Sequence, residues 1–137
     1  MKKPTLPPHV QFHEDVQLFV WKLHGPVNEA VVNKVISFLG HTEAVSRRPF
    51  NRFTDLSAQE AAELSFKYIF HVSLYRRLSC AGRPPVKSAF LVTTPEAAHL
   101  VKIHVMMTDH SPLQVEMFEE RDAAAKWLGV PVEALQS

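Results

Sequence analysis

Segments typical of strands alternate with segments typical of helices along most of this chain, and this alternation limits the possible folds more than any single motif. Strand-like runs occur twice between residues 9 and 23 and again at 50–55, 86–92 and 113–118. Apolar residues at helical spacing cover 27–39, 57–81, 94–108 and 122–128. Such an order predicts a two-layer α/β fold with about four helices and a mixed five-stranded sheet. We expect the sheet to be mostly parallel, with an antiparallel N-terminal edge hairpin.

Local signals mark several helix ends. Ser57, followed three residues later by Glu60, forms a capping box that predicts the start of a long helix reaching about residue 81. Thr94 precedes a proline and an acidic residue, which predicts the N-cap of the next helix. Gly40 and Gly129 each follow a helical pattern and predict its end.

Length and composition indicate one domain without a membrane span. The chain has 137 residues, which fits a single domain over 9–137 after a flexible N-terminal segment, 1–8. That segment lacks the apolar run of a signal peptide, and no stretch has the length of a membrane span. A net charge of +1 gives no indication of nucleic-acid binding. Because Cys80 is a single cysteine, we predict a cytoplasmic protein, with peripheral membrane contact as an alternative.

The sequence contains no recognisable catalytic or metal motif. His99 and His104 are five residues apart, so they point to different sides of one helix. His9 and His13 share a strand face but lie roughly 13 Å apart, which is too far to share one ion. Neither a nucleophile elbow nor a glycine-rich phosphate loop is present. We therefore predict no catalytic residue, no metal and no cofactor, and hence no enzymatic activity; a small enzyme is the third hypothesis.

The carboxyl ends of the strands form a candidate rim, where open α/β sheets usually bind ligands. The rim residues are Asp55, Thr93 and Thr94. Free amides at two helix starts could accept an anion there, but Glu60 and Glu96 already occupy these positive ends. The sequence therefore favours a structural role for the rim.

The second and third predicted helices have more apolar surface than one sheet contact needs. In the long helix, one stripe is predicted to face the core: Leu64, Tyr68, Tyr75 and Leu78. A second stripe lies most of half a turn away, and the next helix is apolar nearly all round. The candidate binding residues are the following: Phe66, Phe70, Leu74, Ile103 and Met107. Three explanations stay open: the helices pack on each other, they form a dimer interface, or they line an apolar pocket or membrane-facing patch.

Seven basic residues are expected near one end of a parallel sheet, and acidic residues near the other. The basic set is Arg47, Arg48, Arg52, Arg76, Arg77, Arg83 and Lys87. Compensation of helix dipoles explains part of this polarity. The remainder suits a weak anionic partner such as a lipid headgroup surface.

The element order, the run Asp55-Leu56-Ser57 at a strand-to-helix turn, and the segment from Phe118 to Gly129 resemble the SpoIIAA-like branch of the STAS superfamily. The resemblance covers roughly residues 12–135. It implies a non-enzymatic regulatory or binding module, and relatedness in fold to lipid carriers implies an apolar ligand and membrane contact. The phosphorylation switch of STAS antagonists uses an Asp-Ser-Ser-Gly-type motif. This chain lacks the second serine and the glycine, so Ser57 is expected as a helix cap rather than a phospho-acceptor.

The residues and the resemblance together predict a STAS-like regulatory or carrier module. Through its second and third helices it would bind an apolar small molecule, a membrane surface, or a protein partner such as a second copy. The alternative is a phospho-switched signalling protein of the anti-sigma-factor-antagonist type, acting through Ser57. No nucleic-acid partner is expected.

Overall fold

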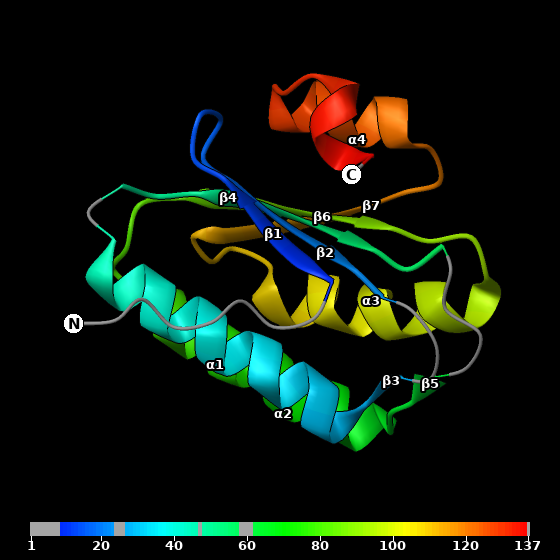
Figure 1. Ribbon diagram of the computed structural model, residues 1–137. Coiled ribbons are helices and arrows are strands. Elements are labelled where there is room, and N and C mark those ends of the chain that lie inside the picture. The colour runs from blue at the N-terminus through cyan, green and yellow to red at the C-terminus, as the bar shows by residue number, and fades with distance from the viewer. Residues whose placement is uncertain (1–8, 24–26, 47, 58–61, 137) are drawn as a thin grey trace.

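The five-stranded sheet of the computed structural model follows the predicted order (Figure 1). The model describes residues 9–23, 27–46, 48–57 and 62–136. From edge to edge the strands are β1 (Val10–His13), β2 (Leu18–Lys22), β4 (Asn51–Asp55), β6 (Val86–Leu91) and β7 (Leu113–Phe118). β1 pairs antiparallel with β2, and every other neighbouring pair in this sheet is parallel. The predicted mixed α/β sheet with its antiparallel edge hairpin is therefore confirmed.

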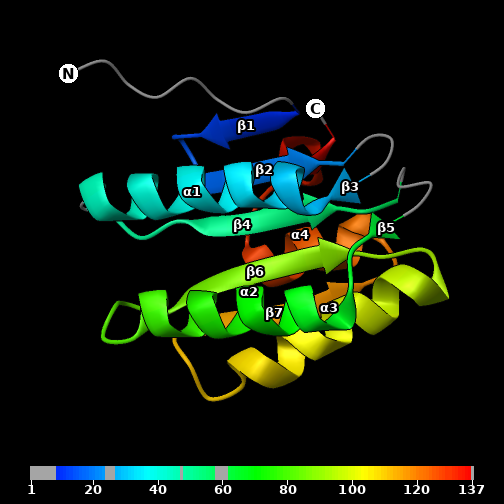
Figure 2. The same cartoon turned by 90° about the horizontal axis from the view of Figure 1, so that it is seen from below.

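Helices cover both faces of this sheet. One face carries α1 (Glu29–Val45), α2 (Phe66–Cys80) and α3 (Pro95–Thr108) (Figure 1). In Figure 2, which views the molecule from below, α1 lies in front of β2 and β4, and α2 lies in front of β6 and β7. The other face carries α4 (Arg121–Leu128) and the 3-10 helix η1 (Val132–Leu135). The four predicted helices are present, and α4 with η1 adds partial cover to the second face.

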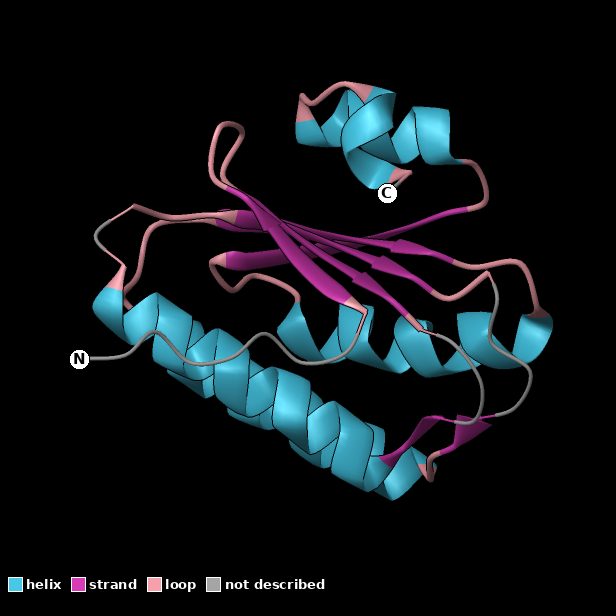
Figure 3. Ribbon diagram, in the orientation of Figure 1, coloured by secondary structure: helices cyan, strands magenta, loops and turns pink. Residues whose placement is uncertain are grey.

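A small parallel ribbon lies apart from the main sheet (Figure 3). It consists of β3 (Val27–Asn28) and β5 (Ala62–Glu63). Two residues are too short to produce the alternation that identifies a strand, so the sequence pattern did not predict this ribbon.

Some helices begin or end where the local sequence signals predict, and others do not. Thr94 caps α3 by accepting a hydrogen bond from the amide of residue 97, and Gly129 ends α4 with a φ of 73°, as predicted. α1 continues through Gly40 to residue 45, so that predicted end was wrong. A glycine inside a helix costs only about 1 kcal/mol, which packing readily offsets. The long helix begins at Phe66 with Ser65 as its cap, and not at Ser57; Glu60 lies outside the described residues.

The two faces of the central strands differ in chemistry, because alternate residues of a strand point to opposite sides. Toward α4 and η1 they contribute apolar side chains, among them Val20, Phe53 and Ala89. Toward the three longer helices, β4 contributes Arg52 and Thr54 instead. This face therefore has a polar centre between apolar flanks.

Separate apolar clusters fix the helices to those flanks. Val35 and Leu39 of α1 pack with Phe19 and Phe50 near the β1 edge. On the other side, Val101 of α3 packs in a cluster with other apolar residues that include Val92 and Ala97. α2 packs chiefly against α3. The space between these clusters is where the candidate site lies.

Candidate functional site

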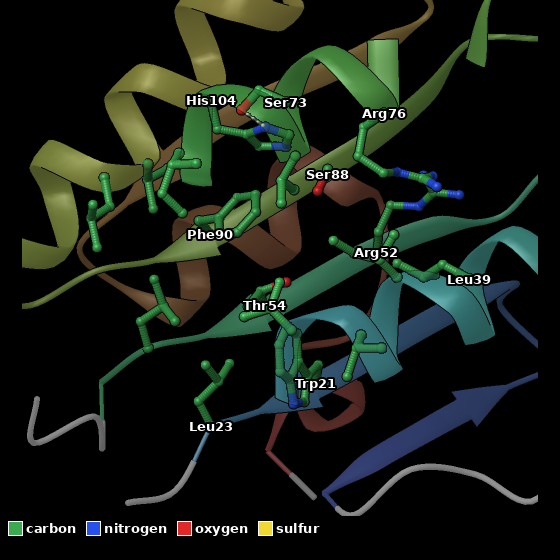
Figure 4. A pocket seen from close by; sticks show the side chains of 18 of the residues that line it. Trp21, Leu23, Leu39, Arg52, Thr54, Ser73, Arg76, Ser88, Phe90 and His104 are labelled. Atoms are coloured by element: carbon green, nitrogen blue, oxygen red, sulfur yellow. Dashed lines mark hydrogen bonds between the residues drawn. The ribbon is translucent and has the colours of Figure 1, made fainter. Parts of the chain in front are cut away.

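A cavity of about 150 Å³ lies between the sheet and α1, α2 and α3 (Figure 4). Apolar side chains from all these elements form most of its wall, including Trp21, Leu23, Ile36, Val72 and Leu100. An engineered protein cavity of similar volume, lined by apolar side chains, stays dry and binds benzene. The cavity therefore has the size and lining for a small apolar molecule.

The register of the central strands explains why this space stays unfilled. Arg52 of β4 is paired with Ser88 of β6, so both side chains lie next to each other on the face toward the helices. Thr54 follows two residues later on the same face. Large apolar residues at these three positions would fill the space under the sheet. The small or extended polar residues leave it open.

One end of the cavity is formed by two buried arginines that share one carboxylate oxygen. Arg52 Nη2 lies 2.8 Å from Glu43 Oε2, and Arg76 Nη2 lies 2.7 Å from the same atom. Each arginine is 4% exposed. Two guanidinium groups against one carboxylate leave one positive charge in excess within this group.

Burial and charge shift the ionisation of the group in ways that keep Glu43 charged. Burial alone would raise the pKa of Glu43, but its hydrogen bond from Arg76 and the charge of Arg52 outweigh burial and lower that pKa. Burial lowers the pKa of Arg52, and the attraction of Glu43 opposes this shift. The Arg52 guanidinium also lies 4.8 Å from the ring centre of Phe50, a cation–π contact.

Two N–H groups of these arginines have no hydrogen-bond partner among the described residues. They are Arg52 Nε and Arg76 Nη1, and both atoms are fully buried. Buried polar groups in proteins are nearly always hydrogen-bonded, so each exception requires an explanation. Because both atoms are fully buried, they do not face the cavity; other atoms of the two arginines line it.

Ser73 and His104 form a second polar pair in the wall. Ser73 Oγ and His104 Nδ1 are hydrogen-bonded at 2.8 Å, and the imidazole meets the Phe90 ring edge-on with 5.6 Å between ring centres. Burial, and secondarily the charge of Arg76, lower the pKa of His104 to about 4. The imidazole is therefore neutral at pH 7.

A serine bonded to a histidine is also the arrangement of a nucleophile and its base. General bases work best when their pKa lies near the operating pH, and about 4 is too low for that. Ser73 moreover has no exposed surface. We therefore assign Ser73 and His104 to the wall of the cavity and not to a catalytic pair.

The inner face of α2 differs from the predicted one. Ile69, Val72, Ser73 and Arg76 line the cavity, whereas Tyr75 and Leu78 are 55% and 66% exposed. Assigning these last two to the core was wrong, because the inner face of α2 includes Ser73 and Arg76 and so has little apolar signal.

The candidate binding stripe lies on the solvent side of α2. Phe66, Phe70 and Leu74 are exposed, and Ile103 and Met107 of α3 are half-buried. The stripe therefore does not line the cavity. Binding of a partner or a membrane by these five residues stays a prediction.

The predicted rim is a hydrogen-bonded joint between β4 and α4. Asp55 is buried; its carboxylate accepts hydrogen bonds from the amide and hydroxyl of Ser57 and from Arg121 Nη2, the last at 2.6 Å. Burial would raise the pKa of Asp55, but the bonds from Ser57 and Arg121 lower it. Ser57 therefore binds Asp55 and is not the N-cap of α2, and its phosphorylation stays a prediction. Thr93 is exposed, and Thr94 caps α3.

The predicted basic surface is divided by the fold. Including Arg52 and Arg76 in it was wrong, because both are buried against Glu43. The others act separately: Arg77 donates to the carbonyls of Met107 and Asp109, Arg83 to those of Ser79 and Glu43, and Lys87 to that of Trp127. Arg48 is exposed, and Arg47 lies outside the described residues.

The sequence contained one signal for the site that the prediction missed. Arg52 shares a strand face with Phe50, two residues earlier, and a charged residue that is buried on an apolar face is almost always paired. Within the described helices none is long and apolar enough to cross a membrane, and the described residues contain no cluster of three potential metal ligands.

Comparison with known proteins identifies the fold. The sequence matches no protein-family model and no curated protein. The structure is similar to the crystal structure of an uncharacterised protein of the DUF3478 family with a SpoIIAA-like fold, from Shewanella loihica. The TM-score is 0.57 at 12% sequence identity, over 87% of this chain and 90% of that one. The expected SpoIIAA-like fold is thereby confirmed.

Proposed function

We propose that this protein is a non-enzymatic binding module that holds a small, largely apolar molecule in the cavity beneath its sheet. The cavity of about 150 Å³ is the observation that carries the proposal. A molecule that fills the space recovers contacts that the lining side chains otherwise lack.

The proposal keeps the predicted class of function and changes the place where it occurs. The cavity has walls from the sheet and from three helices, whereas the exposed stripe of Phe66, Phe70 and Leu74 offers contact on one side only. A small ligand gains most when water is excluded around its whole surface. The inner face of α2 is therefore the better binding surface for a small molecule.

Tryptophan fluorescence offers a direct test with bromobenzene as the probe, because bromine quenches indole fluorescence on contact. Trp21 lines the cavity, whereas Trp127 packs on the opposite face of the sheet. In a Trp127→Phe background we expect saturable quenching by bromobenzene. Val72→Phe places a ring in the cavity and should remove the saturable part.

The matched control is Leu74→Phe, which adds the same ring to the exposed face of the same helix and should leave the quenching unchanged. Quenching that stays linear with probe concentration, or that is equally strong in Val72→Phe, would show that the cavity does not bind the probe.

A further inference from the structure

We infer that the outer face of α2 is a docking surface for an anionic lipid membrane, on which the helix lies parallel to the plane of the bilayer. The outer face consists of five exposed apolar side chains: Phe66, Phe70, Leu74, Tyr75 and Leu78. The cavity is lined from the opposite side of the helix, so this inference does not depend on a molecule in the cavity. Three observations support it: the polarity of α2, the shape of its outer face, and the charges along it.

α2 is more apolar on its exposed side than on its buried side. Its buried residues are Ser73, Arg76 and Cys80, whereas the five side chains of the outer face are between 40% and 66% exposed. The polar groups inside have partners within the protein, because Ser73 bonds to His104 and Arg76 bonds to Glu43. Helices of globular proteins normally show the reverse arrangement. An exposed apolar surface of this kind marks a contact site, so we expect the outer face to be covered by a partner.

The outer face has the shape of a ridge. Phe66, Phe70, Leu74 and Leu78 follow one another at intervals of four residues, so they extend roughly 18 Å along one side of the helix. Figure 1 shows α2, together with α1, on the side of the molecule opposite to α4. None of these four side chains lines the cavity or the smaller hollow of about 90 Å³ near Cys80. A bilayer adapts its shape around an apolar ridge, which suits a helix that lies in the membrane interface.

The charges along α2 favour a negatively charged partner. The sequence contains no aspartate or glutamate between Glu63 and Glu96. Lys67 is exposed and lies two helical turns before Leu74, so it belongs to the same side of the helix as the ridge. A lysine can place its aliphatic chain along an apolar surface and its ammonium group among lipid headgroups.

The neighbouring helices leave this positive charge uncompensated. α3 adds an exposed lysine, Lys102. The acidic residues of α1 and α3 are Glu29 and Glu96, each in the first turn of its helix, and Glu43, which is bound to the buried arginines. Each basic residue next to an anionic membrane increases the affinity about fivefold.

The same charges disfavour a second copy of the chain as the partner. Two outer faces packed on each other would bring Lys67 of both copies into one interface, and α2 offers no carboxylate to either of them. Like charges brought together in an interface lower the affinity. An anionic membrane satisfies both features of the outer face, its apolar ridge and its positive charge.

Co-sedimentation of the whole protein with vesicles tests the inference. The vesicles are phosphatidylcholine alone or phosphatidylcholine with about 30% phosphatidylserine. We expect saturable binding to the anionic vesicles and at least about tenfold weaker binding to the neutral ones. Binding to the anionic vesicles should decrease as the salt concentration rises from about 0.1 to about 0.5 M, because salt screens exposed charges.

Two variants locate the contact. Phe70→Gln removes an apolar side chain from the ridge and should weaken binding to the anionic vesicles about tenfold. Lys67→Glu reverses a charge beside the ridge and should weaken it about tenfold or more. The matched control is Lys126→Glu, the same reversal at an exposed position of α4, on the other face of the sheet, which should change the affinity by less than about twofold. All three positions are exposed, and urea unfolding shows that each variant is folded.

Several outcomes would overturn the inference. They are an absence of binding to the anionic vesicles, equal binding to both kinds of vesicle, and equal losses in Lys67→Glu and Lys126→Glu. Unchanged binding in Phe70→Gln would also overturn it, because the ridge would then take no part. Sedimentation velocity tests the second copy as the partner: a dimer that Phe70→Gln converts into a monomer would show that another protomer covers the outer face. Phe70 does not line the cavity, so each of these outcomes leaves the proposed function standing.

Discussion

Replacing Glu43 by glutamine is expected to lower the free energy of unfolding by about 3–5 kcal/mol. Glu43 Oε2 accepts hydrogen bonds from both Arg52 and Arg76. A neutral amide cannot compensate either charge, so Glu43→Gln leaves two repelling guanidinium groups in a buried site. The substitution preserves side-chain volume, so the loss reports on charge and hydrogen bonding rather than on packing.

Urea unfolding followed by circular dichroism measures this loss. The matched control is Glu116→Gln, the same change at an exposed position of β7, which should alter stability by less than about 0.5 kcal/mol. A loss below about 1 kcal/mol in Glu43→Gln would show that the arginines are not held by this carboxylate, and the described geometry of the cavity end would be wrong.

Lowering the pH from 7 to 5 is expected to destabilise the protein by about 2 kcal/mol through His104 alone. The pKa of His104 is lowered from 6.5 to about 4 by burial and by Arg76. Between pH 6.5 and about 4, His104 is mostly protonated in the unfolded chain and mostly neutral in the folded one. The stability of the folded state is therefore fully present above about pH 6.5 and falls as the pH decreases toward 4.

His104→Gln isolates this contribution, because glutamine retains a hydrogen-bonding group for Ser73 but does not titrate. The free energy of unfolding should fall less between pH 7 and 5 in this variant than in the unaltered protein. Parallel pH profiles of the two proteins would mean that the imidazole is hydrated in the folded state, which contradicts its place in the cavity wall.

The sequence predicted the fold where local chemistry and packing agree. β7 has alternating apolar residues, Thr94 caps α3, and Gly129 adopts the left-handed conformation that ends α4. The prediction failed at the start of α2. Ser57 and Glu60 match the capping-box pattern, whereas Ser65, which forms the actual cap, does not. Ser57 instead donates a hydrogen bond to Asp55, two residues earlier, and such local bonds compete with helix capping.

The candidate site was harder to predict, because it depends on residues that are usually exposed. Arg52 and Arg76 resemble surface arginines in the sequence, and only the pairing of β4 with β6 and the position of α2 bury them with Glu43. The apolar stripe that was predicted to bind a ligand lies on the outer side of α2. The number of apolar residues on each face of α2 does not show which face meets the sheet, because the inner face carries Ser73 and Arg76.

The central claim, that the cavity beneath the sheet binds a small apolar molecule, is tested most directly by methyl NMR during titration with bromobenzene. Three methyl-bearing residues line the cavity, Val72, Leu100 and Val101, while Leu74 and Val31 lie on the exposed faces of α2 and α1. We predict saturable shifts of the first three sets of methyl signals with the last two unmoved. Shifts confined to Leu74 and Val31, or no saturable shift at all, would contradict this account.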